Sequence, residues 1–245
     1  MSGSPRVGIV SQARMGSTRL PGKVLLRAGG NPLLGWHLAR LRQTGLPIYL
    51  ATTTLAEDDA LADFARYNDL PFVRGSATDV LARYRQCAAA FELDIIIRVT
   101  SDCPLIAPEL ITTGLATYLA AHDPDLYVSN SAPQRSYPRG FDYEIFSRQQ
   151  LETAFIEATL PADREHVTPY LHQNRSGRTH FLNLARTLDA SHLRLTVDTP
   201  EDFALIDRLL TDHHAGTLDG EALIALLAAH PELVALNSHI EQKKL

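Results

Sequence analysis

Residue types that bind phosphate are concentrated in one short segment near the start of the chain. They follow the apolar run VGIVSQA at 7–13 and are Arg14, Gly16, Ser17, Thr18, Arg19, Gly22 and Lys23. Glycines let backbone N–H groups approach an anion, hydroxyl groups donate hydrogen bonds, and cationic side chains neutralise charge. This combination indicates a binding site for a polyphosphate.

The distribution of charge favours the same interpretation. The first 56 residues contain seven Lys and Arg and no Asp or Glu, whereas the remainder contains 16 basic and 28 acidic residues. A chain with a net charge of −5 therefore concentrates positive potential around this early segment. A pI near 6.0 argues against a nucleic-acid partner.

The early segment does not match the common phosphate-binding motifs. Five residues rather than four separate Gly16 from Gly22, and Val24 stands where a Walker A loop has Ser or Thr after its lysine. The segment also lacks the GxGxxG fingerprint of dinucleotide-binding proteins. The alternative interpretation, a basic surface turn, stays open from this segment alone.

Two aspartates follow strand-like apolar runs. Asp102 ends IIIRVTSD at 95–102, and Asp198 ends LRLTVD at 193–198. Either carboxylate alone could cap a helix, but Thr199 is placed to cap the helix after Asp198. Strands of one parallel sheet end at one edge, so paired carboxylates opposite a cationic loop predict Mg²⁺ held between protein and phosphates.

Other candidate residues carry weaker signals. Arg74 follows another apolar run, and Asp79 lies at a helix start, where capping is the simpler role. Arg164 and His166 lie just after Pro161, although a lone histidine is more often structural.

The segment 130–144, NSAPQRSYPRGFDYE, interrupts the regular pattern with prolines and aromatic residues. We predict a structured loop or hairpin over the site, and a candidate dimer contact, that contributes Arg139 and Asp142 around Gly140. A solvated loop is the alternative for these charges.

Short apolar runs alternate with longer helical patterns along the chain. Strands are predicted at 7–13, 48–53, 95–100, 126–130, 180–184 and 193–198, and helices at 32–44, 56–69, 78–92, 107–121, 147–159, 163–174 and 200–213. Asn31 and Pro32 resemble an N-cap with Pro at the first helical position, and Gly45 would end that helix. The alternation predicts an α/β fold with a mostly parallel central sheet and helices on both faces, in a single domain over 1–245 with a helical tail from about 215.

Cysteine usage and hydropathy bound the class of protein. Cys87 and Cys103 show no CxxC spacing, so we expect two reduced thiols rather than a disulfide framework or a zinc site. No apolar run approaches the roughly 20 residues of a membrane span, and the start lacks a signal-peptide pattern. We expect a cytoplasmic protein with no membrane partner.

Six blocks of sequence together resemble the cytidylyltransferase family, in particular its spore-coat polysaccharide biosynthesis branch, which is related to the CMP-sialate and CMP-Kdo synthetases. They are QARMGSTRLPGK at 12–23, VRGSATDVLARY at 73–84, RVTSDCPL at 98–105, YPRGFDYEIF at 137–146, REHVTPY at 164–170 and VDTPEDF at 197–203. The resemblance covers about residues 6–213. The sialate and Kdo branches do not share the YPRGFDYE block in this form, which leaves the acceptor open.

The resemblance implies a Rossmann-like nucleotidyltransferase fold of the glycosyltransferase A type, CTP and Mg²⁺, and a CMP-sugar as product. Catalytic roles are implied for Arg14, Lys23 and Asp102, and metal binding for Asp102 and Asp198. Nucleotide binding is implied for Ala13, Arg14, Gly16, Ser17, Thr18, Arg19, Lys23, Arg74 and Asp79. The acceptor would contact Arg139, Asp142, Arg164 and His166, and the family suggests a homodimer.

The expected reaction is attack of an acceptor hydroxyl on the α-phosphorus of CTP, with release of pyrophosphate, for polysaccharide or glycan biosynthesis. Two alternatives remain at this point. One is a glycosyltransferase that uses a nucleotide-sugar donor, although the clear Asp-x-Asp instance, Asp123-Pro124-Asp125, precedes a strand rather than ending one. The other is a non-catalytic nucleotide-binding relative.

Overall fold

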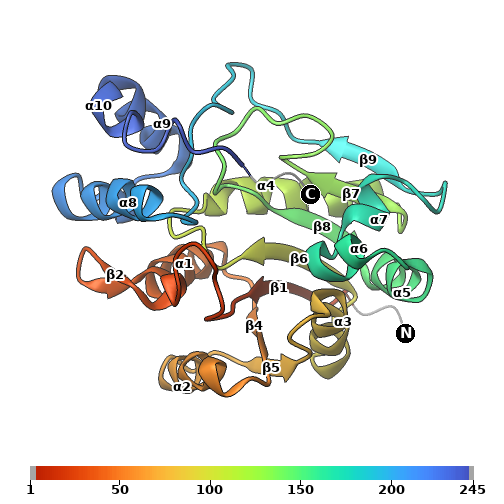
Figure 1. Cartoon of the computed structure of the whole chain (residues 1–245). Helices are drawn as coiled ribbons and strands as arrows, with labels where there is room; N and C mark the ends of the chain where they lie inside the picture. Colours follow the sequence, from red (N-terminus) through yellow and green to blue (C-terminus); the bar gives the residue numbers. More distant parts are fainter. Residues whose placement is uncertain (1–3, 243–245) are drawn as a thin grey trace.

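Seven strands form the central sheet of the protein in a computed structural model that describes residues 4–242 (Figure 1). Their order across the sheet is β5-β4-β1-β6-β8-β7-β9. The bounds are β1 Val7–Gln12, β4 Ile48–Thr53, β5 Phe72–Gly75, β6 Ile95–Thr100, β7 Leu126–Ser129, β8 Glu144–Ser147 and β9 His180–Asn183. Strands β2 (Arg27–Ala28) and β3 (Asn31–Pro32) form a separate two-stranded sheet.

The helices connect these strands. They are α1 Leu33–Leu41, α2 Asp59–Tyr67, α3 Val80–Ala90, α4 Pro108–Ala121, α5 Arg148–Glu157, α6 Pro161–His166, α7 Pro169–His172, α8 Pro200–Asp212, α9 Gly220–Ala229 and α10 Pro231–Val234. Short 3₁₀ turns lie at Lys23–Leu25, Arg42–Thr44, Ala56–Asp58 and Ala215–Thr217. Within residues 4–242, no helix is long and apolar enough to cross a membrane.

The sheet is parallel except at β8, which runs antiparallel to both β6 and β7. Strand β1 pairs in parallel with β4 on one side and β6 on the other, with Ile9 opposite Ile48 and Ile97. The chain therefore reverses its direction of travel across the sheet at β1. In sheets of this type ligands bind at such a reversal, beyond the carboxyl ends of the strands.

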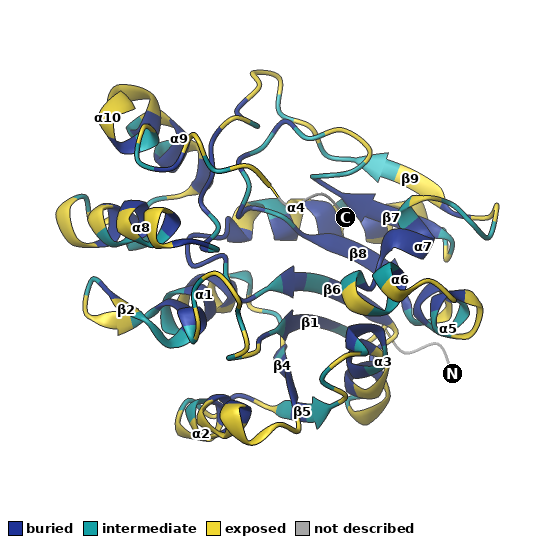
Figure 2. Cartoon of the chain, in the orientation of Figure 1, coloured by how far each residue is buried: buried dark blue, intermediate teal, exposed yellow. Residues whose placement is uncertain are grey.

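Alternate residues along the strands pack against helices on opposite faces of the sheet. Ile9 belongs to a core cluster that includes residues of α1, α2 and α4, whereas its neighbour Val10 packs with residues of α3, α5 and α7. A third cluster joins α8 and α9 to the segment 193–197. The inner strands are accordingly mostly buried, the edge strands β5 and β9 are partly exposed, and the helices expose one side (Figure 2), which confirms the predicted α/β architecture with helices on both faces.

The predicted strand at 193–198 is wrong. Its N–H groups bond to other loops: that of Leu195 donates to the carbonyl of Arg139 at 2.7 Å, and that of Val197 to the carbonyl of Asp102 at 2.9 Å. Only an isolated bridge between Arg139 and Arg194 resembles strand pairing. The segment is thus an extended loop over the end of the sheet rather than part of it.

Three further features of the fold differ from the prediction. The helix at 163–174 is two short helices, α6 and α7, because Val167 adopts a positive φ of 72° between them. Pro32 precedes the first turn of α1 as its N-cap instead of opening it. Strand β8 was not predicted, because its short sequence follows directly on the YPRGFDY segment; Glu144 is buried there, paired with Arg98.

Candidate active site

A cleft of about 480 Å³ opens at the carboxyl ends of β1 and β6. Its lining residues are Gln12, Ala13, Arg14, Gly16, Ser17, Thr18, Arg19, Lys23, Val24, Thr100, Asp102, Cys103, Arg139, Asp142, Glu165, His166, Thr196, Asp198 and Gln242. The predicted phosphate-binding residues other than Gly22 are therefore brought together with both predicted metal aspartates.

The phosphate segment after β1 is held in place from outside the cleft. The buried carboxylate of Asp58 accepts a hydrogen bond from the backbone N–H of Met15 at 2.6 Å and another from the Thr53 hydroxyl. Gly22 adopts the left-handed conformation, with φ 67°, and its N–H donates to the carbonyl of Met15 at 3.0 Å. A residue with a side chain would be strained at this turn, so Gly22 lets the segment fold back and present Lys23.

Lys23 lies between the two aspartates. Its ammonium Nζ is 2.8 Å from Asp102 Oδ2 and 2.7 Å from Asp198 Oδ1, and its side chain is only 11% exposed. Asp102 follows β6 through Ser101, as the sequence predicts. Asp198 arrives by a different route, on the 193–198 loop that the Val197–Asp102 backbone bond ties to the end of β6.

The pKa values of this cluster reflect mutual neutralisation. Burial raises the pKa of Asp102, but the adjacent Lys23 ammonium and a hydrogen bond from Thr100 overcome this and hold it at about 2. Burial lowers the pKa of Lys23, but the carboxylates of Asp102 and Asp198 outweigh that effect and raise it. Asp102 and Lys23 therefore both carry charge at neutral pH.

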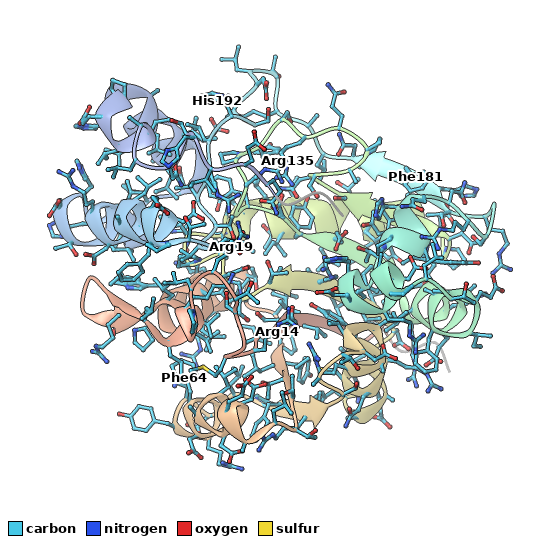
Figure 3. All side chains as sticks on the ribbon, viewed as in Figure 1. Arg14, Arg19, Phe64, Arg135, Phe181 and His192 are labelled. Atoms are coloured by element: carbon cyan, nitrogen blue, oxygen red, sulfur yellow. The ribbon has the colours of Figure 1, made fainter. Side chains whose placement is uncertain are left out.

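Arginines surround the same position. Arg19 Nη2 lies 3.2 Å from Asp198 Oδ2, and Arg194 Nη2 donates to that oxygen at 2.8 Å. Arg14 contacts Glu165 at 3.7 Å and is 43% exposed. Figure 3 shows Arg14 and Arg19 near the middle of the molecule, where the loop after β1 crosses the end of the sheet.

The weaker candidates separate into two groups. Arg139, Asp142 and His166 line the cleft. Burial, with Arg135 next, lowers the pKa of the Arg139 guanidinium, while Asp142 is itself paired with Arg135.

Arg74, Asp79 and Arg164 do not line the cleft. The Arg74 guanidinium donates to the carbonyls of Thr53 and Leu55, each at 2.8 Å, and pairs with Asp59. The Asp79 carboxylate caps α3 by accepting from the N–H of Ala82 and also pairs with Arg164. These three side chains are already engaged in fixing the loops beside the site.

Sequence reasoning missed Arg194, Asp202 and Gln242. Arg194 donates from Nε to Asp202 Oδ1 at 2.8 Å, and Asp202 is fully buried beneath Asp198. An arginine four residues before Asp198 was a readable signal for an ion pair across the loop. Gln242 follows α10 and carried no signal, because its place in the cleft depends on the path of the last residues.

The position of the Lys23 ammonium tests whether the cleft suits a divalent cation. Two carboxylate oxygens converge on one cation there, and oxygen is the ligand that Mg²⁺ prefers. Among the described residues, no group of three or more His, Cys, Asp or Glu side chains could hold a metal. Mg²⁺ is usually bound by one or two carboxylates plus substrate phosphates, so the pair present fits that mode.

The charge balance of the cleft also favours binding of a divalent cation. Four lining side chains are Lys or Arg and four are Asp or Glu. A triphosphate would therefore enter a cleft whose cations are already neutralised, unless additional positive charge accompanies it.

A second hollow, of about 630 Å³, lies between α9–α10 and the segment 186–193. It is larger than the cleft but is lined mainly by apolar side chains, and its Arg186 and Glu221 pair with each other. It brings together no convergent charges, so the smaller cleft is the candidate active site.

Comparison with known proteins identifies the family of the chain. A family model described as Cytidylyltransferase matches residues 7–229. The spore coat polysaccharide biosynthesis protein SpsF of Bacillus subtilis is 32% identical, covering 91% of this chain and 94% of its own. A 3-deoxy-manno-octulosonate cytidylyltransferase of Solibacter usitatus is 27% identical, covering 82% and 92%. The structure of a cytidylyltransferase from Leptospira borgpetersenii superposes with a TM-score of 0.87 at 32% identity, covering 98% and 100%.

Proposed function

The chain belongs to the cytidylyltransferase family, and from that premise we propose that it transfers CMP from CTP to a sugar acid or related acceptor with release of pyrophosphate. The observation that carries the proposal is the convergence of Asp102 and Asp198 on one cation position, opposite the phosphate segment 14–23. We place the reaction in the cytoplasm, which suits the two free cysteines, and in the biosynthesis of surface polysaccharide or glycan.

In this reaction the acceptor hydroxyl oxygen forms a bond to the α-phosphorus and gives up its proton to solvent, while the bond from that phosphorus to the bridging oxygen of the β-phosphate breaks and pyrophosphate leaves. Asp102 and Asp198 would hold Mg²⁺, which when bound neutralises phosphate charge and lowers the pKa of the attacking hydroxyl. Arg14, Lys23 and the backbone N–H groups of the segment hold the triphosphate and stabilise the charge that develops on pyrophosphate. Alignment and charge neutralisation dominate such transfers.

The chain contributes cation binding more than proton transfer. A carboxyl group with a pKa near 2, as at Asp102, is a poor proton acceptor at neutral pH. We therefore assign Asp102 to holding charge, and not to general-base catalysis.

An acidic acceptor suits the part of the cleft that Arg139 lines. Arg139 lies there on the loop between β7 and β8, and its cationic form is disfavoured by burial and by Arg135. An incoming carboxylate would relieve that cost by pairing with it. Asp142 and His166 also line the cleft and would contact acceptor hydroxyl groups. We further propose a homodimer that forms through the segment 130–145.

The test is release of pyrophosphate by purified protein with CTP, Mg²⁺ and a panel of ulosonic and other sugar acids. We expect release with at least one acid, and less with UTP in place of CTP. Arg139→Met should raise KM for the acceptor with little effect on KM for CTP. No release with any acid, together with no binding of CTP, would refute the proposal, and turnover of an intact nucleotide sugar would favour glycosyl transfer instead.

A further inference from the structure

The last described residues of the chain return to the candidate active site. After α10 the chain runs back from the edge of the molecule toward its middle (Figure 1). Asn237, only 2% exposed, lies on this segment, and Gln242 lines the cleft. Neither residue has a role in the reaction as described so far.

Asn237 completes the surroundings of a buried carboxylate. Its amide Nδ2 donates to Asp202 Oδ1 at 2.8 Å and to the carbonyl of Arg194 at 3.1 Å. Asp202 also accepts two hydrogen bonds from the Arg194 guanidinium, at 2.8 and 3.0 Å. A buried carboxylate with so many donors is held in one orientation, and removing a donor loosens that hold even though each oxygen keeps another partner.

That carboxylate controls where Asp198 lies. Asp202 Oδ2 accepts from the backbone N–H of Asp198 at 2.9 Å, which fixes its main chain. Arg194 Nη2 donates to Asp198 Oδ2 at 2.8 Å, which fixes the side chain and leaves Oδ1 directed at Lys23. Gln242 Oε1 accepts from Arg194 Nη1 at 2.7 Å and so orients the same guanidinium from the cleft side.

We propose that Asn237 and Gln242 are positioning residues through which the C-terminal segment orients Asp198, by way of Arg194 and Asp202, for binding of a divalent cation. The proposal rests on the proposed function, because it concerns the same cation. Partners that orient a metal ligand typically change metal affinity or activity by about 10–100-fold when they are mutated.

The decisive comparison is Asn237→Asp against Asn237→Ala. Aspartate has nearly the shape of asparagine but places a carboxylate against the carboxylate of Asp202. If Asn237 positions by donating hydrogen bonds, Asn237→Asp should weaken Mn²⁺ binding more than Asn237→Ala, by about tenfold or more relative to the natural protein. If it serves only packing, the order should reverse. Ser238→Ala is the matched control, because Ser238 lines the apolar hollow on the other side of the segment.

The measurement is Mn²⁺ affinity in the presence of CTP, by electron paramagnetic resonance, on full-length protein whose folding is checked by thermal unfolding. In turnover, kcat should fall more than KM for CTP rises, because the nucleotide-holding segment 14–23 is untouched. Should Asn237→Asp fail to fold, Gln242→Leu replaces it: Gln242 is exposed, and its loss should weaken Mn²⁺ binding a few-fold without changing stability.

Unchanged Mn²⁺ affinity in folded Asn237→Asp, or in Gln242→Leu where that variant replaces it, would overturn the positioning role. With an active natural protein, that result would leave the proposed function intact. Conversely, a natural protein that neither transfers CMP nor binds CTP, but whose variants bind Mn²⁺ in the predicted order, would refute the proposed function and retain the positioning role.

Discussion

Replacing Lys23 by methionine removes both ion pairs that its ammonium makes, with Asp102 and with Asp198. Methionine keeps most of the side-chain volume and removes the charge, so Asp102 loses the cation that holds its pKa at about 2 instead of the ordinary 3.8. That shift corresponds to about 2 kcal/mol of stability at neutral pH. Asp198 keeps Arg19 and Arg194 as partners and should add little.

The pH dependence gives the sign of this effect. A depressed carboxyl pKa stabilises the folded protein above the unfolded value, and this contribution disappears as the pH falls toward the folded value. The difference in free energy of unfolding between the natural protein and Lys23→Met should therefore be full above about pH 4 and vanish as the pH approaches 2. Urea unfolding at several pH values measures it, with Arg208→Met, which removes an exposed pair with Asp212, as the control that should change little.

The same variant should bind Mn²⁺ more tightly than the natural protein when no nucleotide is present. The ammonium and the metal compete for Asp102 Oδ2 and Asp198 Oδ1, so removing the competitor should raise the affinity by about tenfold. Its KM for CTP should nevertheless rise, because the triphosphate loses a cation. Unchanged stability at pH 7 together with unchanged Mn²⁺ affinity would show that Lys23 does not balance these carboxylates.

Three further changes test Asp198 and two buried residues beside the site: Asp58, and His37, whose Nδ1 bonds the carbonyl of Cys103. Asp198→Ala should abolish pyrophosphate release while circular dichroism shows a folded protein; full activity would remove its metal role. Asp58→Asn should raise KM for CTP, because the N–H of Met15 loses its carboxylate acceptor at 2.6 Å. Kinetics with varied CTP would measure this. An unchanged KM would mean that the segment 14–23 keeps its conformation without Asp58. Burial lowers the pKa of His37 to about 4. The free energy of unfolding should therefore fall by about 3 kcal/mol as the pH falls from 6.5 to 4. Urea unfolding of His37→Gln should show no such fall, and an equal fall would contradict the lowered pKa of His37.

The sequence predicted the parts of the site that local patterns encode. The strand at 7–12 is apolar and β-branched, and its loop carries glycines and cations, so both the element and the side chains that it brings to the cleft were readable. Asp102 was readable for the same reason, because it follows a buried strand. Thr199 caps α8 with Asp202 in a capping box, as the spacing of the two residues indicates.

Contacts between distant segments were not readable. Arg74 looks like a site residue because it ends a strand, yet its guanidinium is used by the neighbouring loop at Thr53–Leu55. The 193–198 segment has the composition of a strand, but its N–H groups find acceptors in the loops after β6 and in the 130–144 segment. In each case a hydrogen bond between segments far apart in the sequence determines the local structure. Such a bond cannot be inferred from a single sequence.

The charge arrangement implies that binding of the metal and binding of the nucleotide at the cleft depend on each other. Lys23 and Arg19, two cations that the family resemblance assigns to nucleotide binding, both contact Asp198 in the structure. They can serve a triphosphate only if something else balances Asp102 and Asp198, and a divalent cation at the position of Nζ carries the two positive charges needed to do so. Binding of the metal and of the nucleotide would then each favour the other, because linkage between two sites is reciprocal. A cleft that neutralises itself when empty is thus a reason to expect CTP and the metal to enter together.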